Sequence, residues 1–312
     1  MSSVPAPIER VLELRPVSLD FFRSDPDQLY QPPGARGVFG GTVVAQALTA
    51  AWRTVDGDSF APHSMHCYFI LAGDASLAID YSVVRVRDGR SFVTRTVQAC
   101  QRGKCIFTTT VSFQVVGASS GNGNGNDSDG VKHQMPYPGA NLPQPDEVKD
   151  YVDQVADLHA RGAISRYELA NAANLRLLPT QSRPVASTSS TSSSSSSSSI
   201  KNQVWVRAKG KIADPRAHAT ALAYLSDVAL LGTAARVNQV PADNVAMMVS
   251  LDHVIYFHQP SFRADDWLLY VMHSPWSGSD RALVYGSLYS ASTGVLVASV
   301  VQEGVLRLKS RL

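Results

Sequence analysis

Cysteine is scarce in this sequence. The 312 residues include three cysteines, Cys67, Cys100 and Cys105, and no two of them have the CxxC spacing. A small and odd-numbered set without that spacing argues against a disulfide scaffold and against a zinc site. The cysteines are therefore expected to be reduced and packed, and no metal is predicted.

Long hydrophobic runs and a large excess of one charge are also missing. No stretch of about 18 apolar residues is available to cross a membrane, and residues 1–15 lack the apolar core of a signal peptide, so no membrane insertion is expected. Lysine and arginine total 28 against 26 aspartates and glutamates, which gives a net charge of +2. This balance lacks the basic stripe of a nucleic-acid-binding protein, but leaves an anionic small molecule open as a ligand.

Apolar residues, in contrast, are plentiful. They make up 44% of the chain, and its length favours about two domains. Two low-complexity segments, residues 117–130 and 186–199, are too polar to bury a core. We therefore expect an N-terminal domain (1–116), a partly helical connector (117–203) and a C-terminal domain (204–312).

The two outer blocks repeat one order of elements. Each is expected to open on an apolar helix, over residues 42–55 in the first and 218–234 in the second. Segments with period-2 alternation and turn residues between them follow each helix. Because a helix that is apolar on every face must be enclosed, the pattern predicts an α+β double hotdog, with each antiparallel sheet wrapped around a long helix. Two unrelated α+β domains are the alternative.

Asp227 is the most informative polar residue of the second predicted helix. It is the only ionised residue at the centre of an apolar run, and no lysine or arginine lies three or four positions away. Burying an unpaired carboxylate costs several kcal/mol, so such a residue is a candidate for a functional site. An aspartate that faces solvent, or that is bonded to a hydroxyl, is the competing interpretation.

Ser250 and Gln302 are weaker candidates. Ser250 ends an apolar run, and Gln302 shares one face of a predicted strand with Val300 and Gly304. A polar side chain that faces a core needs a hydrogen-bonding partner. Taken alone, each of the two residues is more often structural than catalytic.

Several motifs resemble the type II acyl-CoA thioesterases, the TesB-like family, and in particular their peroxisomal members. They occur in both blocks and in the family's order, and read FGG followed by VVAQAL, HSMHCYF, SLDH, PSFRADDWLLY, SPW and VQEGV. The resemblance implies a double hotdog that hydrolyses fatty acyl-CoA to free fatty acid and CoA by base-activated attack of water. It places the family's catalytic residues at Asp227, Ser250 and Gln302. It implies no cofactor, and it favours a homo-oligomer.

The chain ends in Ser310, Arg311 and Leu312, which is similar to the peroxisomal address Ser-Lys-Leu with one cation exchanged for another. This ending predicts binding to the peroxisomal import receptor and a location in the peroxisomal matrix. A chance tripeptide is the alternative.

Two other functions remain possible for such a fold. A hotdog enoyl-CoA hydratase or dehydratase would need an aspartate and a histidine acting together, and Asp227 has no histidine partner on its predicted helix. A non-catalytic acyl-CoA-binding module would bind its ligand without releasing thiol.

Overall fold

A computed structural model describes most of the chain. The described residues are 4–57, 59–117, 131–164, 169, 172, 176, 178–185 and 201–309. Most of both low-complexity segments lies outside this set, as do Ser310, Arg311 and Leu312.

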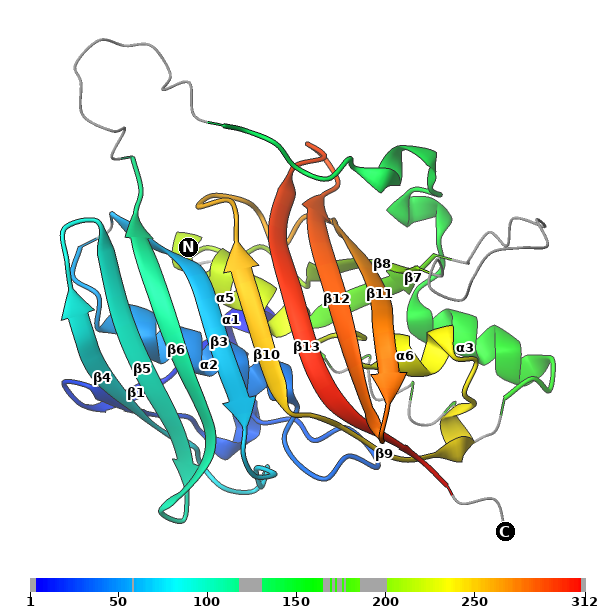
Figure 1. The fold of residues 1–312 in the computed structure, drawn as a ribbon, viewed down its shortest axis with the longest axis horizontal. Helices are drawn as coiled ribbons and strands as arrows, with labels where there is room; N and C mark the ends of the chain where they lie inside the picture. The colour runs from blue at the N-terminus through cyan, green and yellow to red at the C-terminus, as the bar shows by residue number, and fades with distance from the viewer. Residues whose placement is uncertain are drawn as a thin grey trace.

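One antiparallel sheet of thirteen strands forms the body of the molecule (Figure 1). Its first half contains, in spatial order, β1 (Arg15–Ser18), β2 (Phe21–Arg23), β4 (Asp80–Asp88), β5 (Phe92–Gln101), β6 (Lys104–Val115) and β3 (Phe60–Phe69). Its second half continues with β10 (Asp252–Phe257), β13 (Leu296–Leu308), β12 (Arg281–Ser290), β11 (Leu268–Gly278), β8 (Asn202–Ala208) and β7 (Thr180–Pro184), and β9 (Val245–Ser250) pairs with β13.

The two halves of the sheet meet at β3 and β10. These strands run antiparallel, with Cys67 opposite His253 and Met65 opposite Ile255. Backbone pairing at this junction turns two strand edges that would otherwise be open into the middle of one sheet. Residues far apart in the sequence are thereby held in a fixed register across the molecule.

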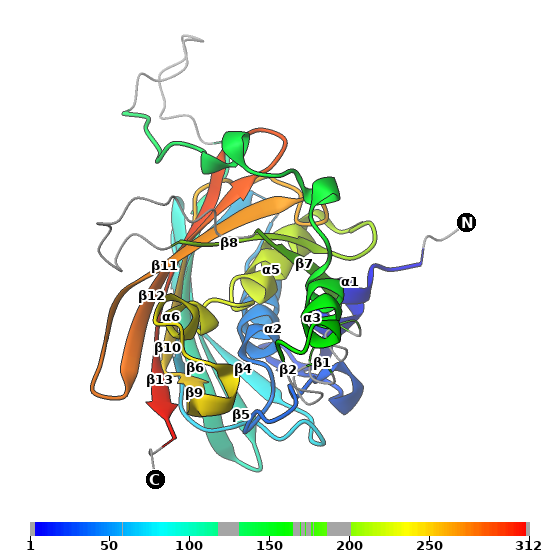
Figure 2. The same cartoon turned by 90° about the vertical axis from the view of Figure 1, so that its right-hand side faces the viewer.

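The helices lie on one side of the sheet, as Figure 2 shows for α2 and α5. The α-helices are α1 (Pro7–Leu12), α2 (Gly40–Arg53), α3 (Tyr151–Ala160), α5 (Pro215–Leu225) and α6 (Gly232–Val237). Short 3-10 turns cover Pro26–Gln28, Pro138–Asn141, Pro145–Glu147 and Ala242–Asn244. Helix α2 is buried along most of its length and packs against α5, so the enclosed apolar helix expected over residues 42–55 is confirmed.

The single helix predicted over residues 218–234 is wrong in one respect. Helix α5 ends at Leu225, and the chain turns before α6 begins. The Ser226 hydroxyl donates to the carbonyl of Ala223, and Ala229 adopts a left-handed backbone with φ +63°. Local hydrogen bonding by a serine competes with the helical ladder, and a left-handed residue ends it. Asp227 therefore lies in a turn rather than in the middle of a helix.

The sequence patterns also missed four strands. β1 and β2 are only four and three residues long, too short for a period-2 signal. β7 comes from the connector and pairs with β8, which precedes α5. Neither block therefore opens on its predicted helix, since α1, β1 and β2 precede α2 in the first and β8 precedes α5 in the second.

A single hydrophobic core runs through both halves. Leu48 and Phe113 from the first half belong to the same buried cluster as Leu222 and Met272 from the second. A smaller cluster around Trp205 lies under the connector. The shared core fixes α5 against α2, and with it the turn that carries Asp227.

Candidate active site

The carboxylate of Asp227 points at the N-terminus of α2, which belongs to the other half of the molecule. Its Oδ2 accepts a hydrogen bond of 2.8 Å from the backbone N–H of Gly41. The N-terminal end of a helix carries a partial positive charge and unpaired amides, so it favours a negative group. The pairing joins residues that are 186 positions apart in the sequence.

Glycine is required at this end of α2 because the two halves approach so closely. A Cβ atom on Gly40 would lie 2.9 Å from Asp227 Oδ2 and 3.0 Å from the ring of Phe69. A Cβ atom on Gly41 would lie 2.7 Å from the carbonyl oxygen of Tyr224. The Gly-Gly pair therefore makes room for the carboxylate as well as opening the helix.

Gln302 connects the other two predicted site residues. Its Nε2 group donates to Asp227 Oδ1 at 2.9 Å and to Ser250 Oγ at 2.8 Å. Gln302 lies on β13, Ser250 ends β9, and the register pairs Ser250 with Gly304, two residues along from Gln302. The structure thus brings Asp227, Ser250 and Gln302 together in one cluster. As predicted, Gln302 faces the same buried side of its strand as Val300 and Gly304.

Burial raises the pKa of Asp227 from 3.8 to about 6, while the hydrogen bonds from Gln302 and then Gly41 act in the opposite direction. Desolvation outweighs them because no cation is among the groups that act on the carboxylate. The residue is nevertheless not sealed off. Asp227 and Ser250 both keep part of their surface open to solvent, whereas Gln302 is completely buried. The carboxylate can therefore take up a proton at a pH only slightly below neutrality, in a residue that is only partly buried.

His253 supports this turn from behind. Its Nε2 lies 2.8 Å from Ser226 Oγ, and Ser226 gives its own hydrogen to Ala223, so Nε2 carries the proton in this bond. Burial lowers the pKa of His253 to about 3, which leaves the ring neutral. The hydroxyl of Tyr270 donates to the carbonyl of Ser226 at 2.6 Å. Together these contacts fix the residue that precedes Asp227.

Only one of the two ring nitrogens of His253 is hydrogen-bonded within the described residues. Its Nδ1 atom is buried and has no hydrogen-bonding partner among the described residues. The ring bonds to Ser226 and not to the carboxylate, whose partners in the described part of the chain are Gly41 and Gln302. Among the described residues, Asp227 therefore forms no aspartate–histidine pair of the kind a hydratase would use.

Gly41 is the site residue that sequence reasoning did not assign. In the sequence the Gly-Gly pair stands out only as part of the FGG motif, and its partner lies in the other half of the chain. The available signal was a pair of glycines at the N-terminus of a helix, where an anion binds most readily.

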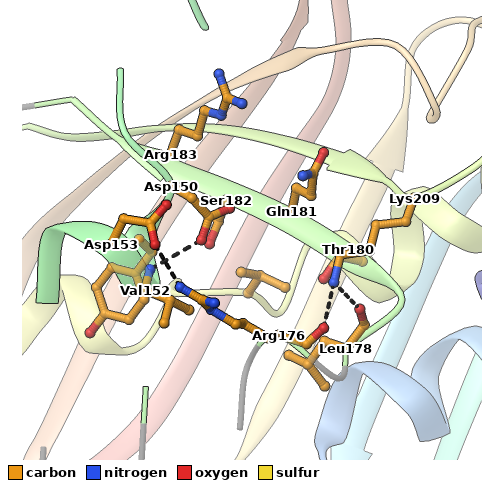
Figure 3. A pocket seen from close by; sticks show the side chains of 12 residues that line it. Asp150, Val152, Asp153, Arg176, Leu178, Thr180, Gln181, Ser182, Arg183 and Lys209 are labelled. Carbon is orange, nitrogen blue, oxygen red and sulfur yellow. Dashed lines mark hydrogen bonds and ion pairs between the residues drawn. The ribbon is translucent and has the colours of Figure 1, made fainter. Parts of the chain in front are cut away.

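A cavity of about 400 Å³ opens elsewhere, between α3 and β7 (Figure 3). Its charged groups are engaged with one another and with the backbone. Arg176 pairs with Asp153 at 2.6 Å, and Lys209 donates to the carbonyl oxygens of Arg176 and Leu178. The lining includes Val228, the residue after Asp227, but Asp227, Ser250 and Gln302 are not among the residues that line this cavity.

Two further features bear on function. Across the ranges that the structure describes, no three histidine, cysteine, aspartate or glutamate side chains gather as a metal site would require. No helix within those same ranges is long and apolar enough to cross a membrane.

The fold defines the class of hotdog thioesterases. A TesB2 acyl-CoA thioesterase II from Mycobacterium marinum superposes with a TM-score of 0.73 and 32% identity over 98% of both chains. A hotdog-fold protein from Alicyclobacillus acidocaldarius shares the fold alone, with a TM-score of 0.67 at 16% identity. The predicted α+β double hotdog is confirmed.

Sequence comparison then gives the family. Residues 29–114 match the acyl-CoA thioesterase N-terminal domain, and residues 146–306 match the acyl-CoA thioesterase C-terminal domain. Human acyl-coenzyme A thioesterase 8 is 40% identical, over 98% of this chain and 90% of its own length. The peroxisomal acyl-coenzyme A thioester hydrolase 1 of Saccharomyces cerevisiae is 31% identical, over 95% and 93%. The chain belongs to the acyl-CoA thioesterase family, whose reaction is the hydrolysis of acyl-CoA, and the predicted family, enzyme class and reaction are confirmed.

Proposed function

We propose that Asp227 is the general base that drives water onto the thioester carbonyl of a fatty acyl-CoA. One observation carries the proposal: the carboxylate is hydrogen-bonded on both oxygens, has a pKa raised to about 6, and belongs to a residue that is only partly buried. A base with a pKa near the working pH takes up a proton readily and is largely ionised when the reaction begins.

Hydrolysis of a thioester needs few catalytic groups besides a general base. In the proposed step, a water oxygen bonds to the carbonyl carbon while one of its protons moves to Asp227. The tetrahedral intermediate then expels CoA thiolate, which is a good leaving group because thiols have pKa values near 8.5. The proton held on Asp227 returns to the thiolate, which restores the base. No covalent acyl-enzyme is needed.

Gln302 and Ser250 act as positioning residues in this proposal. Gln302 uses its amide group on both Asp227 and Ser250, so it fixes the distance between carboxylate and hydroxyl. Ser250 accepts that bond with its oxygen and keeps its own hydrogen for the water or the substrate. Holding a nucleophile in attack geometry supplies much of the entropic part of catalysis. The first turn of α2 lies beside the carboxylate and would stabilise charge on the carbonyl oxygen.

The substrate class and the location of the protein are inferred from similarity to other proteins. A relative named as peroxisomal and the ending Ser310, Arg311 and Leu312 support import into the peroxisomal matrix by the receptor for such signals. We further propose that the substrate is a fatty acyl-CoA and that the chain forms a homo-oligomer, as the family resemblance implies. Fluorescence microscopy of a fusion that keeps the C-terminus free, with and without the last three residues, tests the location.

The catalytic assignment is tested by measuring thiol release from acyl-CoA by the wild type, Asp227→Asn and Asp243→Asn. Asparagine preserves the shape of the side chain but cannot accept the proton, so kcat should fall by roughly 10²- to 10⁴-fold. Asp243 is exposed and lies outside the cluster, so its variant controls for the change of charge and should keep wild-type activity.

Two outcomes would overturn the proposal. A folded Asp227→Asn variant with near-normal kcat would remove the base from Asp227. Absence of thiol release from every acyl-CoA by well-folded wild type, with hydration of an enoyl-CoA or tight binding alone in its place, would favour a hydratase or a binding module.

A further inference from the structure

The hairpin that joins β5 to β6 carries two cysteines on facing positions. Its two-residue turn, Arg102 and Gly103, has φ values of +50° and +72°, as in the type I′ turn that suits a tight hairpin. Gln101 pairs with Lys104 on either side of the turn, and Cys100 pairs with Cys105 in the next position.

In a regular antiparallel ladder, that position has a Cα separation suited to a disulfide. In an antiparallel ladder, hydrogen-bonded and non-hydrogen-bonded pairs alternate, and the pair that closes a two-residue turn is the hydrogen-bonded one. The next pair has Cα atoms roughly 4.5 Å apart, which lies within the range of about 4.4–6.8 Å seen across disulfides. Cys100 and Cys105 are this next pair, immediately before a β-bulge that shifts the register between Ala99 and Cys100, and both are free thiols that are partly exposed.

The thiol of Cys100 is also affected by its neighbour. Burial, and then the neighbouring thiol of Cys105, raises the pKa of Cys100. The third cysteine is far less accessible, since Cys67 is 1% exposed and burial raises its pKa to about 12. The chain therefore contains an accessible pair of thiols and an inaccessible single thiol, which serves as an internal control.

We propose that Cys100 and Cys105 form a reversible disulfide site that reacts with hydroperoxides. One thiolate attacks a peroxide oxygen, which gives a sulfenic acid and hydroxide. The second thiolate attacks the sulfenic sulfur, forms the S–S bond and releases a second hydroxide. Overall, two thiols and one hydrogen peroxide give one disulfide and two waters, so the sulfurs lose two electrons and the peroxide gains them.

The bond should be easy to reduce. A disulfide stabilises a fold mainly by closing a loop in the unfolded chain, and this one closes a very short loop that the turn already brings together. Little stability is gained, so a monothiol such as glutathione should be able to reverse the oxidation.

The pair lies next to the residues that support the active-site helix. The side chain of Gln101 bonds the backbone of Asp74 through both its oxygen and its nitrogen, and Ile106 O accepts from the N–H groups of Ile70 and Leu71. Gly73 O in turn accepts from the N–H of Val38, two residues before Gly40. The proposed site is thus part of the layer that holds the start of α2, although its redox chemistry does not depend on the catalytic role of Asp227.

Tryptic mapping tests the proposal, because trypsin cuts after Arg102 and Lys104, between the two cysteines. Native full-length protein is treated with hydrogen peroxide, alkylated, and digested without reductant. Residues 96–102 and 105–132 should then appear as one linked species, lighter by two hydrogens than the two separate peptides. Glutathione added before alkylation should release them as two alkylated peptides, and Cys67 should be alkylated only after unfolding.

Controls keep the result interpretable. Cys100→Ser and Cys105→Ser should each abolish the linked species, while Cys67→Ser should leave it unchanged. The proposal is overturned if wild type keeps both surface thiols alkylatable after peroxide, if they end as separate sulfinic acids, or if glutathione does not reverse the bond.

Discussion

The properties of Asp227 come from a balance between desolvation and a small number of well-placed donors. Burial alone would push the carboxylate toward its neutral form, and the two hydrogen bonds from Gln302 and Gly41 limit that shift. A pKa of about 6 leaves the group ionised at neutral pH but able to hold a proton for the leaving thiolate. The environment, rather than the residue type, makes this aspartate suitable as a base.

The space around the carboxylate makes a prediction about Gly40. Gly40→Ala would place a methyl group 2.9 Å from the present position of Asp227 Oδ2, so the carboxylate must move. Because a misplacement of about 1 Å can cost about 100-fold in rate, kcat should fall by roughly 10- to 100-fold in thiol-release assays.

Gly232→Ala is the matched control, since nothing lies within 4 Å of a Cβ atom there and its activity should equal that of the wild type. If Gly40→Ala has a wild-type kcat while its melting is unchanged, close approach at α2 is not needed for activity.

Among the individual residues of the site, some could be predicted from the sequence and others could not. Asp227 could be recognised because a lone carboxylate in an apolar run is costly to bury, and this holds whether the residue lies in a helix or in a turn. Ser250 and Gln302 became strong candidates for catalytic residues only through the family resemblance. The pairing of the Gly41 N–H with Asp227 could not be predicted, because it depends on how two distant segments pack together.

Among the elements, the turn between α5 and α6 places the base. Ser226 is held through its hydroxyl by His253 and Ala223 and through its carbonyl by Tyr270. A continuous helix would have carried Asp227 on a face set by the helical period, whereas the turn directs it toward α2. The sequence predicted a continuous helix here because the segment is apolar throughout, and side-chain hydrogen bonds to the backbone leave no trace in periodicity.

The β7–β8 hairpin predicts that the serine-rich tract can be removed. Pro184 pairs with Val204, so the ends of the connecting loop lie on neighbouring strands. Deleting residues 187–199 shortens this loop about threefold, which should change the free energy of unfolding by only about 1 kcal/mol, toward greater stability.

Thiol release by the deletion variant should match the wild type, with thermal melting as the check on folding. A loss of more than about tenfold in kcat/KM from a variant that melts cooperatively would mean that the tract contributes to the site, against the loop argument.

Across the whole molecule, both halves contribute residues to the candidate active site. The second half provides Asp227, Ser250 and Gln302, and the first provides the helix end that holds the carboxylate. The repeated order of helix and strands was enough to predict two hotdogs. Their fusion into one sheet through β3 and β10 was not predictable, because strand partners from different halves leave no pattern in either segment.

The most direct test of the account is the pH dependence of kcat/KM for wild type and Asp227→Asn. An acyl thioester of N-acetylcysteamine is the right substrate, because it lacks the phosphates of CoA, which titrate near pH 6. Asp227 acts as a base only when ionised, so activity should be level above its pKa of about 6 and fall toward tenfold per unit below it. The residual kcat/KM of Asp227→Asn should not fall in this way below pH 6. A wild-type profile that stays level from pH 7 down to 4.5 in folded protein would contradict the assignment of Asp227 as the general base.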